Sequence, residues 1–103
     1  MSNRRHLRVG VTEAKQIAEI AQWWRVNREA APQLFLDELR QAYELVRHQP
    51  HVGQPVVGAK SDRIRRVHLL RSHYHLYYQE SEDGAAIDVL AVWHTSRGSA
   101  PDL

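Results

Sequence analysis

The chain has 103 residues, 43% of them hydrophobic and 25% charged, which is the size and composition of one globular domain rather than of a disordered chain. It contains no cysteine and its formal net charge is only +2, which excludes disulfides, zinc–thiolate sites, cysteine nucleophiles and a uniformly basic protein. No apolar run approaches the roughly 20 residues of a membrane-spanning helix and the start of the chain has no signal-peptide core, so we expect a single domain over residues 1–103 that stays in the cytoplasm and contacts no membrane.

The first part of the chain predicts a short strand followed by a helix. Residues 7–11 alternate apolar and other side chains, as in a strand. Thr12 stands where a helix N-cap is expected, and apolar residues at helical spacing predict a helix over residues 13–28. These apolar residues are Ala14, Ile17, Ala18, Ala21 and Trp24. Trp23 lies off this stripe, so we expect it to be exposed, either as an anchor for a partner or as a rim residue.

A second helix is predicted after a short break. Pro32 is placed in its first turn, and Pro50 stops it after His48. Its apolar positions repeat at intervals of four, three and four residues and are Phe35, Leu39, Ala42 and Val46. Because so few residues join the two helices, we expect them to pack as an antiparallel hairpin.

The second half of the chain predicts a loop and three strands. Residues 50–58 hold two prolines and two glycines and are expected to form a loop. Strands are predicted over residues 63–70, 73–80 and 86–93, with tight turns between them.

The order of these elements predicts the fold class. Residues 86–93 are apolar on nearly both faces, which is typical of a central strand, and we expect Trp93 at its end to be part of the core. Residues 94–103 are expected to form a polar tail. The order β-α-α-β-β-β therefore predicts an α+β fold, with the helical hairpin packed on one face of an antiparallel sheet.

Basic residues are concentrated in two segments. Residues 1–12 carry three arginines and no acid, and residues 60–75 carry five basic residues against one aspartate. Alternation along residues 63–70 puts Arg66 and His68 on the sheet face that the helices leave open. Such a surface suits nucleic acid, through phosphate pairing and base stacking, and it suits a protein partner equally well. A solvated arginine-rich strand would explain the same composition.

Histidine acid–base chemistry is the enzymatic option that the residue types support. Cleavage of RNA by attack of its own 2′-hydroxyl needs a base, an acid and cations for the charge that develops on the phosphate. The candidates for these roles are Arg66, Arg71, His73, His75 and His94. Three of these histidines would also suffice for zinc, but nothing else in their spacing supports a metal, and we expect neither a metal nor a cofactor. The glycines are isolated, so no phosphate-binding loop is predicted.

Taken in order, these residues resemble the RelE/ParE superfamily of toxins from bacterial type II toxin–antitoxin systems. The resemblance is carried by a Pro-His-Val-Gly-Gln-Pro loop, by RIRRVHLLRSHYHLYYQ and by IDVLAVWHTSRG, and it covers about residues 6–98. The chain is most similar to the ParE branch. That branch has an arginine-bearing strand, a Tyr-x-x-x-Tyr strand (Tyr74 to Tyr78 here) and a late strand that ends in His94 with Arg97 nearby.

The resemblance implies one of two targets. ParE-like toxins poison DNA gyrase and are not known to cleave anything, whereas RelE-like toxins cut mRNA in the ribosomal decoding site with a cluster of basic residues. Lys60 is the sole lysine after residue 15, and no basic run follows Arg97, which favours gyrase over the ribosome. We therefore expect a gyrase poison, with a ribosome-dependent mRNA endonuclease as the alternative and an inactive antitoxin-binding relative as a third hypothesis.

The resemblance also implies a cognate antitoxin, which is a small DNA-binding dimer with a flexible acidic tail, and roles in growth arrest and plasmid stabilization. An acidic tail is complementary to exposed arginines, because opposite charge speeds encounter while apolar anchors supply affinity. The residues expected to bind the antitoxin are Arg5, Arg8, Trp23, Arg63 and Arg65. Those expected to bind the target are Arg65, Arg66, Arg71, His94 and Arg97.

Overall fold

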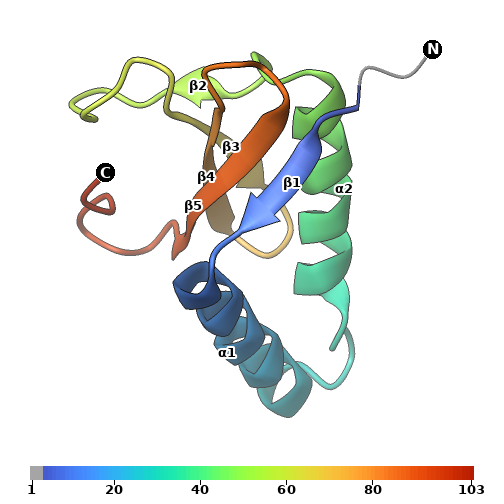
Figure 1. Cartoon of the computed structure of the whole chain (residues 1–103). Coiled ribbons are helices and arrows are strands. Elements are labelled where there is room, and N and C mark those ends of the chain that lie inside the picture. The colour runs from blue at the N-terminus through green and yellow to red at the C-terminus, as the bar shows by residue number, and fades with distance from the viewer. Residues whose placement is uncertain (1–3) are drawn as a thin grey trace.

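The structure, a computed structural model, describes residues 4–103 as two helices and a five-stranded sheet (Figure 1). The strands are β1 (His6–Val9), β2 (Gln54–Pro55), β3 (Arg65–Leu69), β4 (Tyr74–Glu80) and β5 (Ala86–His94), and the helices are α1 (Val11–Asn27) and α2 (Leu34–His48). Within the described residues, neither helix combines the length and apolar character that crossing a membrane requires. The α+β class and the order of the predicted elements are confirmed, with β2 as an addition.

The sheet is mixed, whereas the sequence predicted an antiparallel one. Its strand order is β1-β5-β4-β3-β2. The strands β2 to β5 pair antiparallel, but β1 runs parallel to β5, with Leu7 opposite Ile87. The two helices separate β1 from the antiparallel strands, so no hairpin turn dictates its direction and it pairs with the free edge of β5. The last strand is therefore interior, as its apolar sequence predicted.

Both helices pack on the same face of the sheet, which places the core between the two layers (Figure 1). The predicted stripe of α2 is confirmed, because all four of its residues are buried. In α1 only Ala21 and Trp24 are buried. Ala14 and Ala18 are exposed, contrary to the prediction, while Ile17 of the same stripe packs against the core as a partly buried residue.

The starts of both helices also differ from the prediction. Gly10 is the N-cap of α1, and Thr12 lies inside the first turn, because the helix begins directly after β1. Gln33 precedes the first residue of α2, so Pro32 lies in the preceding turn and not in the helix. Each boundary moves by no more than a turn, and the helical hairpin itself is unaffected.

The predicted loop over residues 50–58 contains the short strand β2, which the sequence did not predict. The hydroxyl of buried Tyr78 donates to the Pro50 carbonyl and accepts from the Gly53 N–H, both at 2.9 Å. Arg65 donates to the Gly53 carbonyl at 2.8 Å. A Cβ atom at position 53 would lie 2.6 Å from the Tyr78 hydroxyl, so only glycine fits. Contacts from other strands hold this segment in place, and its own sequence shows no alternation that predicts a strand.

The sheet face away from the helices is the second face of the fold, and it is partly covered, since Tyr77 and Ala91 on it are buried. On β4, Tyr74, Leu76 and Tyr78 face the helices, a choice that alternation alone left open. Pairing across the strands gives the opposite face two rows, one of His68, His75 and Trp93 and one of Arg66, Tyr77 and Ala91. The prediction that Trp93 belongs to the core is wrong: it is only half-buried, because it belongs to this second face.

The polar tail after β5 has a defined path. The indole N–H of Trp93 donates to the Ser99 carbonyl at 2.7 Å, and the Arg97 guanidinium lies 3.9 Å from the centre of the Trp93 ring system. The Lys60 N–H donates to the Leu103 carbonyl at 2.9 Å. The tail therefore folds back on the domain, and the C-terminus lies on the side of the sheet away from α2 (Figure 1).

Candidate functional site

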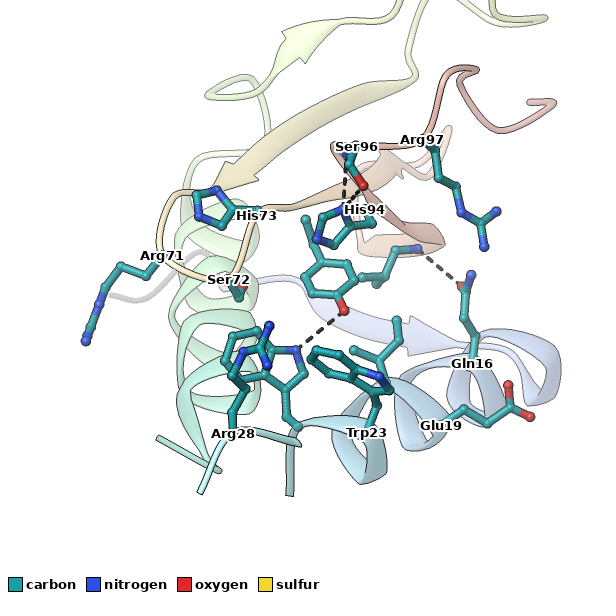
Figure 2. A pocket seen from close by; sticks show the side chains of 14 residues that line it. Gln16, Glu19, Trp23, Arg28, Arg71, Ser72, His73, His94, Ser96 and Arg97 are labelled. Carbon is teal, nitrogen blue, oxygen red and sulfur yellow. Dashed lines mark hydrogen bonds between the residues drawn. The ribbon is translucent and has the colours of Figure 1, made fainter. Parts of the chain in front are cut away.

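A cleft of about 800 Å³ opens where α1 meets the ends of the strands (Figure 2). Its lining comes from three segments of the chain. These are residues 16–28, which run along α1 and just past its end, residues 71–74 at the turn between β3 and β4, and residues 92–97 at the end of β5. The three segments are far apart in the sequence, so the cleft exists only in the folded chain.

Aromatic rings form one wall of the cleft. The Tyr74 hydroxyl accepts a hydrogen bond from the Trp24 indole N–H at 3.4 Å. The Tyr74 ring meets the His94 ring edge-on, with centroids 4.9 Å apart and 86° between the planes. Trp23 packs edge-on against Trp24 and is 44% exposed, which confirms the prediction that it lies off the buried stripe. An exposed tryptophan beside a cleft is a typical anchor for a protein partner.

Three arginines lie near this aromatic wall. The guanidinium of Arg28 lies 4.7 Å from the ring centre of Trp23, and that of Arg97 lies close over Trp93 in the same way. The Arg71 side chain extends outward from the rim (Figure 2). None of the three arginines forms an ion pair with a carboxylate in residues 4–103. The cleft therefore suits an acidic segment that carries an apolar anchor.

A carboxylate from α2 holds the turn that carries His73. The Glu38 carboxylate accepts the backbone N–H groups of Arg71 at 2.9 Å and Ser72 at 2.6 Å. Burial alone would raise the pKa of Glu38, but these donors hold that pKa below its ordinary value. His73 follows with a φ of 66°, which is uncommon for a residue other than glycine. Its carbonyl accepts the Thr95 N–H at 2.8 Å, so the turn is tied to both α2 and the end of β5.

The structure brings four of the predicted catalytic or target-binding residues together and separates the others. Those that line the cleft are Arg71, His73, His94 and Arg97. Arg66 and His75 lie on the sheet face away from the helices, so the five candidates for a ribonuclease do not converge. The same separation removes the three-histidine zinc hypothesis. No group of three or more ligand-type side chains within residues 4–103 is arranged to hold a metal ion.

The residues expected to bind an antitoxin are spread over the surface. Arg5 and Arg8 form ion pairs with acids of β4 and β5, at 2.6 and 2.5 Å, so both are engaged within the chain. Arg65 holds the loop before β2, and Arg63 approaches a glutamate only to 4.0 Å. Of this set, Trp23 is the residue that lines the cleft.

Two residues of the site were not predicted from the sequence. Arg28 comes directly after α1 and stacks on the exposed Trp23. The spacing of an arginine about one helical turn after an exposed tryptophan could have indicated this cation–π contact from the sequence. Glu38 precedes Leu39 of the buried stripe on α2. Nothing in the sequence connects it with a turn more than 30 residues away.

Known proteins are similar to this chain at the level of family and fold. A family model described as the ParE toxin of a type II toxin–antitoxin system, parDE, matches residues 12–98. Among solved structures, the chain is similar to a mutant of the E. coli toxin RelE in the free state, with a TM-score of 0.59 and 17% sequence identity. The alignment covers 90% of this chain and 85% of that one, and at this identity the likeness concerns the fold alone. No curated protein matches the chain significantly.

Proposed function

This chain belongs to the ParE family of toxins from type II toxin–antitoxin systems, and we propose that it arrests growth by poisoning DNA gyrase. A toxin of such a system is paired with an antitoxin that neutralises it. The sequence resemblance to the ParE branch supports gyrase as the target. The observation that carries this choice over the ribosome is the separation of the histidine and arginine candidates onto two surfaces.

A ribonuclease of the kind considered above needs two proton-transfer groups and a cation within reach of one phosphate. His73 and His94 both line the cleft, but His94 Nδ1 already lies 2.7 Å from the Ser96 hydroxyl. The Arg71 side chain extends away from the cleft (Figure 2). Arg66, the other candidate cation, lies on the opposite face of the sheet. Arg28 and Arg97, which do line the cleft, lie over the rings of Trp23 and Trp93. We therefore infer that the cleft serves binding rather than proton transfer.

The same cleft suits the acidic tail of the antitoxin. Trp23 offers an exposed apolar ring, and Arg28 and Arg97 form no ion pair within residues 4–103. Among the described residues that line the cleft, Glu19 is the one acid, against three arginines. A tail bound there would cover His94 and Arg97, which are expected to contact the target. Neutralisation would then follow from direct competition for one surface.

Purified protein tested against both targets distinguishes the mechanisms. With gyrase and plasmid DNA, we expect accumulation of cleaved complex or loss of supercoiling, and with ribosomes and mRNA we expect no specific cut. His73→Gln and His94→Gln should alter gyrase inhibition only through lost contacts, because a poison moves no proton. A nuclease would instead lose about 10²–10⁴-fold in rate. His48→Gln, at an exposed position of α2 outside the cleft, is the matched control.

A ribosome-dependent mRNA endonuclease is the second candidate, because His73 and His94 do share the cleft. A ribosome-dependent cut that either substitution abolishes, with gyrase unaffected, would make the ribosome the target. Binding of the antitoxin with no activity in either assay would identify an inactive antitoxin-binding relative.

A further inference from the structure

The tail after β5, residues 95–103, packs only partly on the domain. A hollow of about 460 Å³ lies between the tail, the first turns of α1 and β5, and its lining includes Leu90, Pro101 and Leu103. Pro101 and Leu103 are half-buried, and no residue of the tail belongs to the buried core. Because the apolar packing beneath the tail is incomplete, polar contacts supply much of its order.

Trp93, the penultimate residue of β5, makes two of these contacts. Its side chain lies on the sheet face away from the helices, in one row with His75. The indole N–H donates to the Ser99 carbonyl at 2.7 Å, while the Arg97 guanidinium lies over the face of the ring, 3.9 Å from its centre. One tryptophan therefore binds Arg97 through its ring and residue 99 through its N–H.

These contacts fix both the backbone and the side chain of Arg97. The Arg97 N–H donates to the His94 carbonyl at 3.2 Å, in a turn where the His94 imidazole accepts the Ser96 N–H at 3.1 Å. After Arg97, the Ser99 carbonyl is tied back to Trp93, which closes a loop of residues 93–99 around the arginine. The ring then restricts where the guanidinium lies.

The charge of Arg97 is held in place without being neutralised. Arg97 forms no ion pair within residues 4–103, whereas Arg5 and Arg8 are both paired with acids. A guanidinium stacked on a ring keeps its N–H donors at its edge, where a partner can reach them. Figure 2 shows Arg97 at the rim of the cleft, on the opposite side of the view from Arg71.

The other stacked arginine of the cleft depends less on its ring. Arg28 lies 4.7 Å from the ring centre of Trp23, but its backbone N–H donates to the Trp24 carbonyl as the C-cap of α1. The helix fixes the backbone of Arg28, whereas Arg97 belongs to no helix or strand. Loss of its tryptophan should therefore disorder Arg97 more than Arg28.

We propose that Trp93 is a positioning residue, which holds Arg97 at the rim of the cleft in the orientation that contacts gyrase. This proposal rests on the proposed function, because it concerns how a target-binding arginine is presented. Since the side chain is ordered before gyrase arrives, less conformational entropy is lost on binding. In this role Trp93 acts through Arg97 and not through a contact of its own with the target.

Nuclear magnetic resonance of the full chain tests the two contacts without gyrase. In ¹H–¹⁵N spectra, the indole signal that is missing in Trp93→Phe identifies Trp93. Its N–H should exchange with solvent more slowly than that of the exposed Trp23, because the Ser99 carbonyl accepts it. In Trp93→Leu, which lacks both contacts, the backbone order parameters of residues 96–99 should fall below about 0.6. Ser99→Ala keeps the accepting carbonyl and should leave those order parameters as in the wild type.

Inhibition of gyrase supercoiling tests what the contacts do for function. Trp93→Phe keeps a ring for Arg97 but loses the N–H, so half-inhibition should need about threefold more protein. Trp93→Leu keeps neither and should need about tenfold more. Val26→Ala, at an exposed position of α1 outside the cleft, is the control and should inhibit like the wild type.

A double-mutant cycle with Arg97→Gln separates positioning from a general loss of structure. If Trp93 acts through Arg97, Trp93→Leu should change inhibition by less than about twofold once residue 97 is glutamine. An equal loss in both backgrounds, full inhibition by Trp93→Leu, or an ordered tail in that variant would each overturn the proposal. A wild-type protein that leaves gyrase unaffected while the spectra show the Trp93 contacts would instead refute the proposed function, and not the placement of Arg97 by Trp93.

Discussion

Glu38→Ala tests whether a single carboxylate holds the wall of the cleft. The substitution removes the acceptor of two backbone N–H groups, at 2.9 and 2.6 Å, in the turn before His73. Hydrogen bonds to charged groups contribute about 1.5–3 kcal/mol each when well buried. Glu38 is only half-buried, so water replaces part of what is lost, and we expect a decrease of about 2 kcal/mol in the free energy of unfolding. For a domain of this size, that lowers Tm by about 10 °C.

The pKa of Glu38 also predicts in which direction its contribution to the free energy of unfolding changes with pH. The pKa of Glu38 is lower in the folded chain than the value of about 4.3 expected in the unfolded chain. Its contribution is therefore fully present above that unfolded value and is lost as the pH falls through the folded value. Urea denaturation at neutral pH should show Glu38→Gln to be less stable than the wild type. The difference should shrink below about pH 4.

Glu82→Gln is the matched control, because the side chain of Glu82 is 92% exposed and reaches Arg63 only at 4.0 Å. Its stability should lie within about 0.5 kcal/mol of the wild type at every pH. Equal melting of Glu38→Ala and the wild type would refute the reasoning. A difference that persisted unchanged in acid would show that lost packing, and not the carboxylate, is responsible.

Four further predictions follow from the fold and the cleft. Tyr78→Phe leaves two backbone groups before β2 without their partner and should lose about 1–3 kcal/mol in urea denaturation. His73→Gly should melt at or above the wild-type temperature, because glycine adopts a φ of 66° without strain, and a lower Tm would contradict this. Truncation after Arg97 removes two hydrogen bonds to tail carbonyls and two half-buried residues, Pro101 and Leu103, but no residue of the buried core, so we expect growth arrest on induction to be lost while Tm falls little; full toxicity would remove the tail from the target site. Trp23→Ala should weaken antitoxin binding in calorimetry by tenfold or more, whereas Val26→Ala, also exposed on α1, should not.

The elements whose apolar residues recur at regular spacing were predictable from the sequence. The stripe of α2 begins at Phe35 and repeats without interruption, and all of it is buried. In α1 the alanines extend the apparent stripe beyond the residues that pack, so periodicity overstated the buried face. β2 has two residues and is held by Tyr78 and Arg65, which are contacts from strands later in the chain. A local pattern carries no information about such contacts.

The candidate site was predictable in its residue types but not in its grouping. Alternation correctly put Arg66 and His68 on the face away from the helices. It gave no reason to expect His73 in a different place from His75. The two are separated because His73 adopts a left-handed conformation and belongs to the turn, while His75 belongs to the strand. The backbone conformation of one residue therefore places the two histidines on different surfaces.

The parallel pairing of β1 with β5 has a consequence for how the toxin is made. The ladder joins residues 80 positions apart, of which Arg8 and Asp88 are one pair. Closing so long a loop is slow, and it cannot begin on a growing chain until β5 has been synthesised. Until then β1 lacks its partner, the helices lack the part of the core that Val89 and Val92 supply, and the cleft lacks the wall supplied by residues 92–97. We therefore expect the chain to gain its toxicity only after β5 has been synthesised and paired. During that interval we expect an antitoxin already present to bind the exposed surfaces before the cleft is complete.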